Sequence, residues 1–312
     1  MMKFRSLALS LRRAVSPAWR RIDMICGVTV IAPKSPGWER VRTFRWYELD
    51  TELFFAATIP AGGTVIDVGA NEGVLTAVAA RIVGPDGRVI AFEPSPGLAA
   101  LARRVFEANG LDNVVLEEAA AGAANSTLRF EPARNGAGYA KAAPTGFEVE
   151  TVALVDYCRE RGICPDVIKI DVDGPEISVL EGLSDLLEGA SRPTLVVELS
   201  NETERLGYSW SEILSFVREQ GYSTYASRMK FARVLPVTSR PDFETIPVRF
   251  ERGDAANLFC TPVPLTAAQR EQIWPQRFVP PAYYRHYLSE RPFSSPAAFW
   301  KAYQREIGVR RS

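Results

Sequence analysis

The sequence predicts an α/β protein built on a doubly wound, seven-stranded sheet. Short apolar runs bounded by glycine, proline or charged residues alternate with stretches of helical composition, as in successive strand–helix units. Three of these runs end in a carboxylate, at Glu93, Asp171 and Glu198. A turn containing two glycines follows the first run of the series. In open α/β sheets ligands bind at the carboxyl edge of the strands, where such turns and side chains meet.

The stretch that organises the chain is 64–73, which reads Thr-Val-Ile-Asp-Val-Gly-Ala-Asn-Glu-Gly. Its apolar residues predict a strand that is buried on both faces. Residues 74–81 then have helical composition, and residues 41–59 are expected to form a helix that leads into the strand. A strand, a glycine turn and the start of a helix present free backbone N–H groups to a small polar ligand.

The spacing of the two glycines argues against two common nucleotide sites. A dinucleotide site has the pattern G-x-G-x-x-G and a triphosphate loop has G-x-x-x-x-G-K-[ST]. Here the turn is Gly69-Ala-Asn-Glu-Gly73, without a middle glycine. Asp67 is poorly placed to face phosphates but suits a positively charged ligand such as S-adenosylmethionine. Glu93 follows Gly69 by 24 residues, near the spacing at which an acidic residue meets ribose hydroxyls.

The remaining elements of the domain follow in order. Strands are expected over 88–94, 113–118, 167–172 and 194–200, and helices over 97–109, 152–162, from about 175 onward and over 210–220. Strands at 223–226 and 256–261 close the sheet. Between 122 and 166, extended stretches joined by a glycine-bearing loop indicate a hairpin-like insertion, which is either a substrate-facing loop or a solvated turn.

The two ends of the chain differ from this domain, which is expected to span 41–262. Residues 1–40 form a basic arm, in which six lysines and arginines precede the first acidic residue, Asp23. A helix lying on a membrane is an alternative to a mobile or self-packing arm. Residues 263–312 hold nine aromatic side chains in 50 residues, which is too aromatic for a disordered linker. This extension is expected to fold over the cleft or onto a second subunit, so a homo-oligomer is left open.

Four motifs occur in a fixed order along the domain. They are Asp67-Val-Gly-Ala-Asn-Glu-Gly73, Ala91-Phe-Glu-Pro-Ser-Pro96, Lys169-Ile-Asp-Val-Asp-Gly-Pro-Glu176 with Val179-Leu-Glu-Gly182, and Val197-Glu-Leu199. Together they resemble the FkbM family of adenosylmethionine-dependent methyltransferases. The resemblance implies a Rossmann-like sheet of the class I methyltransferase kind. One position departs from the family, because Asp173 stands where the family has glutamate, which keeps the charge and shortens the reach.

The sequence and the resemblance together assign roles to particular residues. The glycine turn and Asp67 are expected to hold the methionine half of the cofactor, Glu93 the ribose, and the residues after the third strand the adenine. The expected cofactor contacts are Asp67, Gly69, Asn71, Glu72, Gly73, Glu93, Ser95, Glu118, Ala119 and Asp171. The expected catalytic carboxylates are Asp171, Asp173 and Glu176.

Asp171 is the favoured acceptor-side base, because it ends the fourth strand beside the cleft. Glu176 is equally suited to stabilising the start of the next helix. His286, in the aromatic extension, is the alternative base. The three carboxylates leave a divalent-metal site open, but nothing fixes the number of ligands, so no metal ligand is assigned.

The expected reaction is methyl transfer to a hydroxyl group of a small molecule. Its substrate range, which includes sugars, glycolipids and polyketide-type metabolites, is implied by the resemblance. One alternative is a protein that binds adenosylmethionine without catalysis. Another is a nicotinamide-dependent oxidoreductase, which the missing middle glycine disfavours. No Asn-Pro-Pro-Tyr or Asp-Pro-Pro-Tyr follows the fourth strand, which argues against methylation of exocyclic base nitrogens.

Composition narrows the class of protein further. The chain has 37 basic and 37 acidic residues, so its overall charge gives no sign of a nucleic-acid partner. Cys26, Cys158, Cys164 and Cys260 form no C-x-x-C pair, which is typical of reduced thiols in a cytoplasmic protein. No apolar run reaches the length of a membrane-spanning helix.

Overall fold

A computed structural model describes most of the predicted domain and part of each terminal segment. The described residues are 19–24, 27–33, 47–132, 138–139, 146–189, 191–200, 203, 208–227 and 255–269. The aromatic side chains of the C-terminal extension and His286 lie outside these ranges, as do residues 1–18 of the basic arm. Among the described residues, no helix is both long and apolar enough to cross a membrane.

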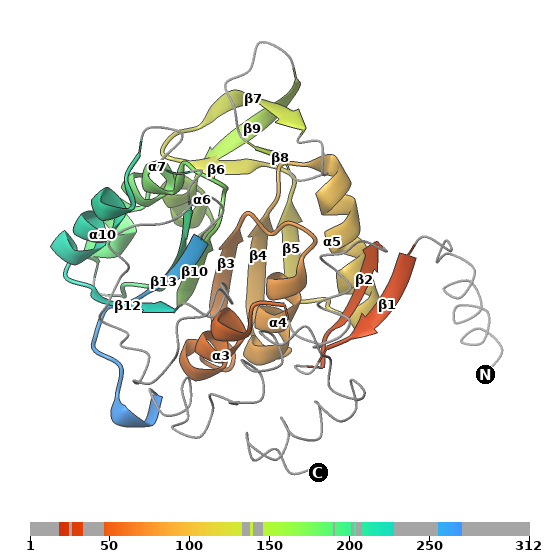
Figure 1. The fold of residues 1–312 in the computed structure, drawn as a ribbon, viewed down its shortest axis with the longest axis horizontal. Helices are drawn as coiled ribbons and strands as arrows, with labels where there is room; N and C mark the ends of the chain where they lie inside the picture. Colours follow the sequence, from red (N-terminus) through yellow and green to blue (C-terminus); the bar gives the residue numbers. More distant parts are fainter. Residues whose placement is uncertain are drawn as a thin grey trace, which may run out of the picture.

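The core of the fold is a seven-stranded sheet in the order β12-β13-β11-β10-β3-β4-β5 (Figure 1). Its strands are β3 (Thr64–Val68), β4 (Arg88–Phe92), β5 (Val114–Glu117), β10 (Val167–Ile170), β11 (Thr194–Ser200), β12 (Ser223–Ser227) and β13 (Ala255–Thr261). Only β13 runs antiparallel to its two neighbours. The strand order reverses between β3 and β10, which confirms the predicted doubly wound sheet of the class I methyltransferase kind.

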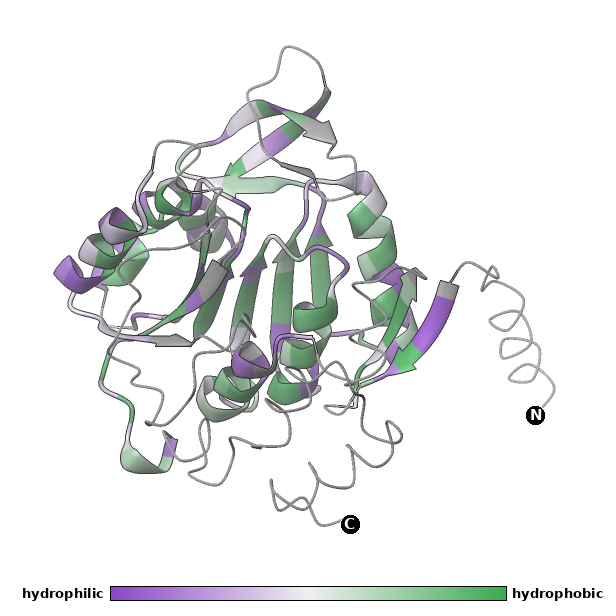
Figure 2. Ribbon diagram, in the orientation of Figure 1, coloured by the Kyte–Doolittle hydropathy of each residue, from purple (hydrophilic) through white to green (hydrophobic). Residues whose placement is uncertain are grey.

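Helices cover both faces of this sheet. They are α3 (Leu49–Thr58), α4 (Val74–Val83), α5 (Pro96–Asn109), α6 (Leu154–Arg161), α7 (Glu176–Glu181), α8 (Ser184–Glu188) and α10 (Trp210–Glu219). Successive residues of a strand point to opposite faces, so Val65 packs in the cluster with α3, α4 and α5, while Ile66 packs with α6, α7, α8 and α10. The central strands are hydrophobic along most of their length (Figure 2).

Local sequence signals fix several of these helices. Pro96 occupies the first turn of α5, and Gly110 ends it in the left-handed conformation, as expected for these two residues. At the start of α10, Ser209 and Glu212 form a reciprocal capping box, which satisfies two backbone N–H groups that the helix leaves without partners.

Part of the expected basic arm belongs to the folded domain. Strands β1 (Trp19–Asp23) and β2 (Thr29–Pro33) form an antiparallel hairpin that lies against α5. The Asn109 side chain accepts a hydrogen bond from Thr29 N at 2.7 Å and donates one to Thr29 O at 2.7 Å. The hairpin also buries Ile22 and Val30 in the core, so it is held by both apolar packing and backbone pairing.

The insertion expected between 122 and 166 forms a small second sheet. Its strands are β6 (Ala120–Gly122), β7 (Ser126–Pro132), β8 (Gly138–Tyr139) and β9 (Phe147–Ala153), in the order β6-β9-β7-β8. β7 and β9 pair antiparallel, as the hairpin-like prediction requires. This sheet lies beyond the carboxyl ends of β3, β4 and β5 (Figure 1). Residues of β6 and β7 in this sheet line the cavity that is described below.

Candidate active site

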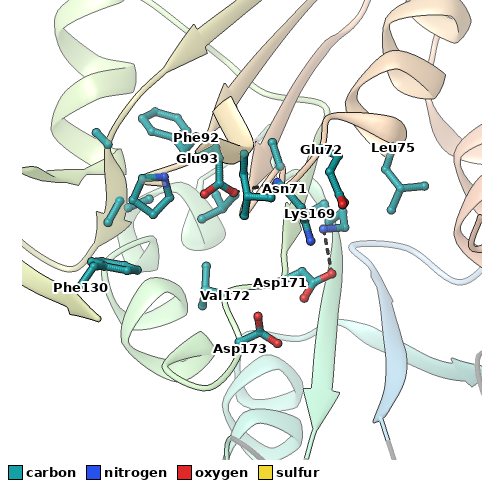
Figure 3. Close-up of a pocket in the computed structure, with 18 of the residues that line it drawn as sticks. Asn71, Glu72, Leu75, Phe92, Glu93, Phe130, Lys169, Asp171, Val172 and Asp173 are labelled. Carbon is teal, nitrogen blue, oxygen red and sulfur yellow. Dashed lines mark hydrogen bonds and ion pairs between the residues drawn. The ribbon is translucent and has the colours of Figure 1, made fainter. Parts of the chain in front are cut away.

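A cavity opens at the carboxyl ends of β3, β4 and β10 (Figure 3). It is bounded by the turn after β3, by the end of β4, by the segment between β5 and β6, by β7 and by the loop after β10. Of the sequence-predicted site residues, seven line it: Gly69, Asn71, Glu72, Glu93, Ala119, Asp171 and Asp173. The other five do not contribute to its lining: Asp67, Gly73, Ser95, Glu118 and Glu176.

The glycine turn brings β3 into close contact with its neighbours. Gly69 has a φ of +80°, and its N–H donates to Phe92 O at 3.0 Å, as does the N–H of Ala70. A Cβ on Gly69 would overlap the carbonyl oxygen of Asp171 at the end of β10. Gly73, with a φ of +76°, starts α4 and lies against Phe106 of α5. The two glycines therefore let the cavity form at the point where the strand order reverses.

An alanine at Gly69 is expected to destabilise the protein by at least about 2 kcal/mol more than an alanine at Gly162. Both positions have positive φ, so both alanines incur a left-handed strain of roughly 1–2 kcal/mol. At Gly162 the new methyl group meets nothing within 4 Å, whereas at Gly69 it collides with backbone. Urea unfolding of the two variants measures the difference. Equal losses would show that the contact with Asp171 is unimportant.

Glu93 is held at the end of β4 by two backbone hydrogen bonds. Asn71 N donates to its Oε2 and Ser95 N to its Oε1, each at 2.8 Å. Burial raises the pKa of Glu93 to about 7, and the two hydrogen bonds only partly oppose that effect. Each carboxylate oxygen can accept more than one hydrogen bond. The side chain can therefore still accept hydrogen bonds from two neighbouring hydroxyl groups in the cavity.

Asp67 makes contacts below the turn and does not line the cavity. It is 2% exposed, and Thr76 Oγ1 of α4 donates to its Oδ2 at 2.6 Å. Lys169 Nζ lies 3.5 Å from the other oxygen of Asp67 and 3.1 Å from Asp171 Oδ2. From the sequence we expected Asp67 to face a positively charged ligand, but in the structure its positive partner is the ammonium of Lys169.

Lys169 was not assigned a role from the sequence. The one sequence feature that points to a role for Lys169 is its charge within an apolar strand, since its neighbours in β10 are valine and isoleucine. In the structure it pairs in register with Asp67 of β3. Its side chain is 4% exposed, and it lines the cavity.

Three carboxylates lie close together at the ends of β10 and β11, and two of them, Asp171 and Asp173, line the cavity. Asp171, Asp173 and Glu198 each place an oxygen within 4.8 Å of the others. Asp173 has a φ of +56°, a left-handed conformation that aspartate adopts more readily than most residues. Oxygen atoms in this arrangement are of the kind that divalent cations bind, but the Lys169 ammonium already pairs with Asp171. Glu198 replaces Glu176 in the acidic group that the sequence led us to expect.

Glu176 supports the loop rather than facing the cavity. Its Oε1 accepts from Gly174 N at 2.8 Å and from Val172 N at 3.4 Å, and its Oε2 accepts from Thr203 Oγ1 at 3.0 Å. Burial raises the pKa of this carboxyl, and the backbone hydrogen bonds oppose the rise. The side chain therefore fixes the loop that carries Asp171 and Asp173.

Two more of the predicted contacts have other partners. The backbone of Ser95 holds Glu93, and Glu118 forms an ion pair with Arg103 at 2.6 Å. Ala119, next to Glu118, does line the cavity.

Comparison with known families agrees with the motifs and the cavity. The family described as "Methyltransferase FkbM domain" matches residues 67–224, just over half of the chain. The chain belongs to the FkbM methyltransferase family. The matched range contains the glycine turn, Glu93 and the acidic loop after β10.

Two curated relatives of this FkbM methyltransferase align over short segments. An arginine N(omega)-methyltransferase from Streptomyces achromogenes subsp. streptozoticus is 46% identical over 57 residues, which are 18% of this chain and 15% of the relative. A protein-L-isoaspartate O-methyltransferase from Ignicoccus hospitalis is 41% identical over 61 residues, which are 20% of this chain and 29% of the relative. The chain thus matches less than a third of either relative.

Solved methyltransferase structures resemble the FkbM chain more distantly. A SAM-dependent O-methyltransferase from Thermotoga maritima has a TM-score of 0.42 and 18% identity, and the alignment covers 79% of this chain and 78% of that one. A precorrin-6y C5,15-methyltransferase from Geobacter metallireducens has a TM-score of 0.40 and 12% identity, with coverages of 67% and 85%.

Proposed function

We propose that this FkbM methyltransferase transfers the methyl group of adenosylmethionine to a hydroxyl group of a small molecule. The observation that carries the proposal is the position of Asp171. Its carboxylate lines the same cavity as Glu93 and is held by Lys169. A carboxylate fixed at that place accepts a hydrogen bond from the attacking hydroxyl group and takes up its proton as the new C–O bond forms.

The cofactor side of the cavity is assigned to three groups. Glu93 accepts hydrogen bonds from the ribose hydroxyls, and the turn from Gly69 to Gly73 lies along the methionine half. Because Asp67 is buried and does not line the cavity whereas Glu72 does, Glu72 is the carboxylate assigned to the amino group of the ligand. Adenosylmethionine supplies an electrophilic methyl group on a sulfonium, so alignment of the acceptor by the protein accounts for much of the rate.

The opposite wall of the cavity favours an acceptor with an apolar part. Leu128 and Phe130 lie two residues apart on β7, so they share one face of the small sheet. Both line the cavity with Val172, and Leu128 is 39% exposed. An exposed apolar side chain in a cavity is available for a ligand. This supports a glycolipid or a polyketide-type metabolite over an unsubstituted sugar.

A second candidate reaction is methylation of a nitrogen in a guanidinium or amino group. The close grouping of Asp171, Asp173 and Glu198 would suit a cationic acceptor. One of the curated relatives bears the name of an arginine N-methyltransferase. Hydroxyl transfer is preferred because the apolar wall has no role in recognising a bare cation.

A ligand panel followed by a labelled-methyl assay tests the proposal. Adenosylmethionine and adenosylhomocysteine should stabilise the protein against heat, by about 2.7 kcal/mol at a hundred times the dissociation constant. NAD and ATP should not. With ¹³C-methyl adenosylmethionine, phenolic and glycolipid acceptors should gain an O-methyl group, whereas arginine and agmatine should not.

Each outcome of the assay decides one alternative. A label on nitrogen would replace the proposal with the second candidate. Stabilisation by adenosylmethionine with no methyl transfer to the hydroxyl acceptors or to arginine and agmatine would favour a non-catalytic binding protein. Stabilisation by NAD alone would overturn the cofactor assignment.

A further inference from the structure

We propose that Lys169 is a positioning residue, whose buried ammonium holds the Asp171 carboxylate in one orientation at the acceptor side of the cavity. The inference rests on the role proposed for Asp171 and goes beyond it by naming the group that fixes that side chain. Nothing in the residue's position requires Lys169 itself to touch the substrate.

Because Lys169 lies within a buried strand, its ammonium destabilises the protein unless it is paired with a negative charge. The other three residues of β10 are fully buried and apolar. Burying a charge in such a strand costs several kcal/mol unless it is paired. A methionine would fill the same position without that cost, so what the lysine adds is its pairing with the two carboxylates, at 3.5 Å from Asp67 and 3.1 Å from Asp171.

The surrounding charges show what the pairing does. Among the described residues that line the cavity, Lys169 carries the only positive charge, whereas four carry carboxyl groups: Glu72, Glu93, Asp171 and Asp173. Asp173 and Glu198 lie close to Asp171, and like charges at that range repel. The ammonium, 3.1 Å from Asp171 Oδ2, is the attraction that opposes this repulsion, and in this proposal it sets the orientation of the carboxylate.

The backbone of Lys169 is held in place by the strands on both sides of β10. Lys169 is paired to β3 on one side and to β11 on the other, and it lies directly opposite Asp67 in the register. Asp67 is itself fixed by the Thr76 hydroxyl of α4. Groups supported by strands and by a second layer of hydrogen bonds are held more tightly than groups on loops. The chain Thr76–Asp67–Lys169–Asp171 thus links α4 and two strands to the loop that faces the acceptor.

A charge-matched double variant tests this role. Lys169→Met with Asp67→Asn removes one positive and one negative charge, so the net charge of the group is unchanged while Asp171 loses the ammonium. We expect kcat with the acceptor that the labelled-methyl assay identifies to fall at least about tenfold, and KM for adenosylmethionine to stay within about threefold. Asp166→Asn, which removes an exposed carboxylate directly before β10, at the end of the strand far from the cavity, is the control and should keep kcat within about threefold.

Two further measurements separate positioning from a general structural effect. In a background of Asp171→Asn, the double substitution should lower kcat no further, because a residue that acts through Asp171 has nothing left to orient. A crystal structure of the double variant should show the Asp171 side chain in a different rotamer. If the double variant shows no cooperative unfolding transition in urea, both tests are repeated with Lys169→Gln combined with Asp67→Asn.

The inference is overturned if the double variant keeps the parental kcat. It is also overturned if its loss multiplies with that of Asp171→Asn, since Lys169 would then act elsewhere. Failure of the proposed function gives a different result, because Asp171→Asn would by itself leave kcat unchanged.

Discussion

Replacing Asp171 with asparagine is expected to lower kcat by at least about 100-fold while binding of adenosylmethionine stays within about threefold, because general-base assistance contributes 10²–10⁴-fold. Asparagine keeps the size and a hydrogen-bonding oxygen but cannot take up the acceptor proton. Asp171 N is also bonded to Val68 O at 3.0 Å, so the backbone around the substitution is held independently of the side chain. Turnover with the acceptor that the labelled-methyl assay identifies measures the first quantity, and calorimetry with adenosylmethionine measures the second.

Asp166→Asn is the matched control for this variant. Asp166 lies at the opposite end of the same strand, directly before β10, where its Oδ2 accepts from Thr64 N at 2.7 Å. Loss of its charge should leave turnover unchanged. If Asp171→Asn also transfers methyl groups at the parental rate, Asp171 is structural, and His286 becomes the next base to substitute.

The parts of the site that the sequence predicted are those that local pattern determines. Gly69 and Gly73 were recognised because their spacing requires a tight turn after a strand, and the structure shows both at positive φ. Glu93 was placed by its distance along the chain from Gly69, and it lines the cavity. In a parallel sheet, the end of a strand is sufficient to predict which edge a side chain occupies.

The parts that the sequence did not predict depend on which residues meet across strands. Lys169 and Asp67 are about a hundred residues apart, and only the register of β3 with β10 places them opposite each other. Glu198 and Glu176 are both acidic residues near strand ends, and only the fold shows that Glu198 joins Asp171 while Glu176 turns to Thr203. The β1–β2 hairpin was missed because its basic composition resembles that of an exposed arm, whereas its pairing with Asn109 is a long-range contact.

Glu93→Ala is expected to weaken binding of adenosylmethionine by at least about 100-fold, since each hydrogen bond to a charged group contributes about 1.5–3 kcal/mol and the ribose offers two hydroxyls. Calorimetry with 5′-methylthioadenosine, which keeps the ribose and lacks the amino acid part, should show a similar loss. Unchanged affinity for both ligands would remove Glu93 from the cofactor site.

Acid should act on the cofactor site through the same side chain. Because burial raises the pKa of Glu93 to about 7, its carboxylate form is depleted below that pH. A ligand that needs the carboxylate then binds about tenfold more weakly for each pH unit below 7. Glu93→Gln cannot titrate, so its weaker binding of 5′-methylthioadenosine should not change between about pH 5.5 and 8. A parental affinity that is equally flat would contradict the assignment.

Acid weakens ligand binding through Glu93, but in the ligand-free protein it should raise the contribution of Glu93 to the free energy of unfolding. A carboxyl whose pKa is higher in the folded state, here about 7 against 4.5, binds protons more readily when folded. Its contribution to the free energy of unfolding is therefore fully present below pH 4.5 and is lost as the pH rises through 7. Other groups titrate in this range, so the contribution is read as the difference between the parent and Glu93→Gln in urea unfolding at each pH. As the pH falls from 7 to 5, the stability of the parent should increase relative to that of Glu93→Gln. Over the same range the affinity of the parent for 5′-methylthioadenosine should fall. Both changes have one cause, because protonation of Glu93 removes a buried charge and also removes the carboxylate that accepts hydrogen bonds from the ribose.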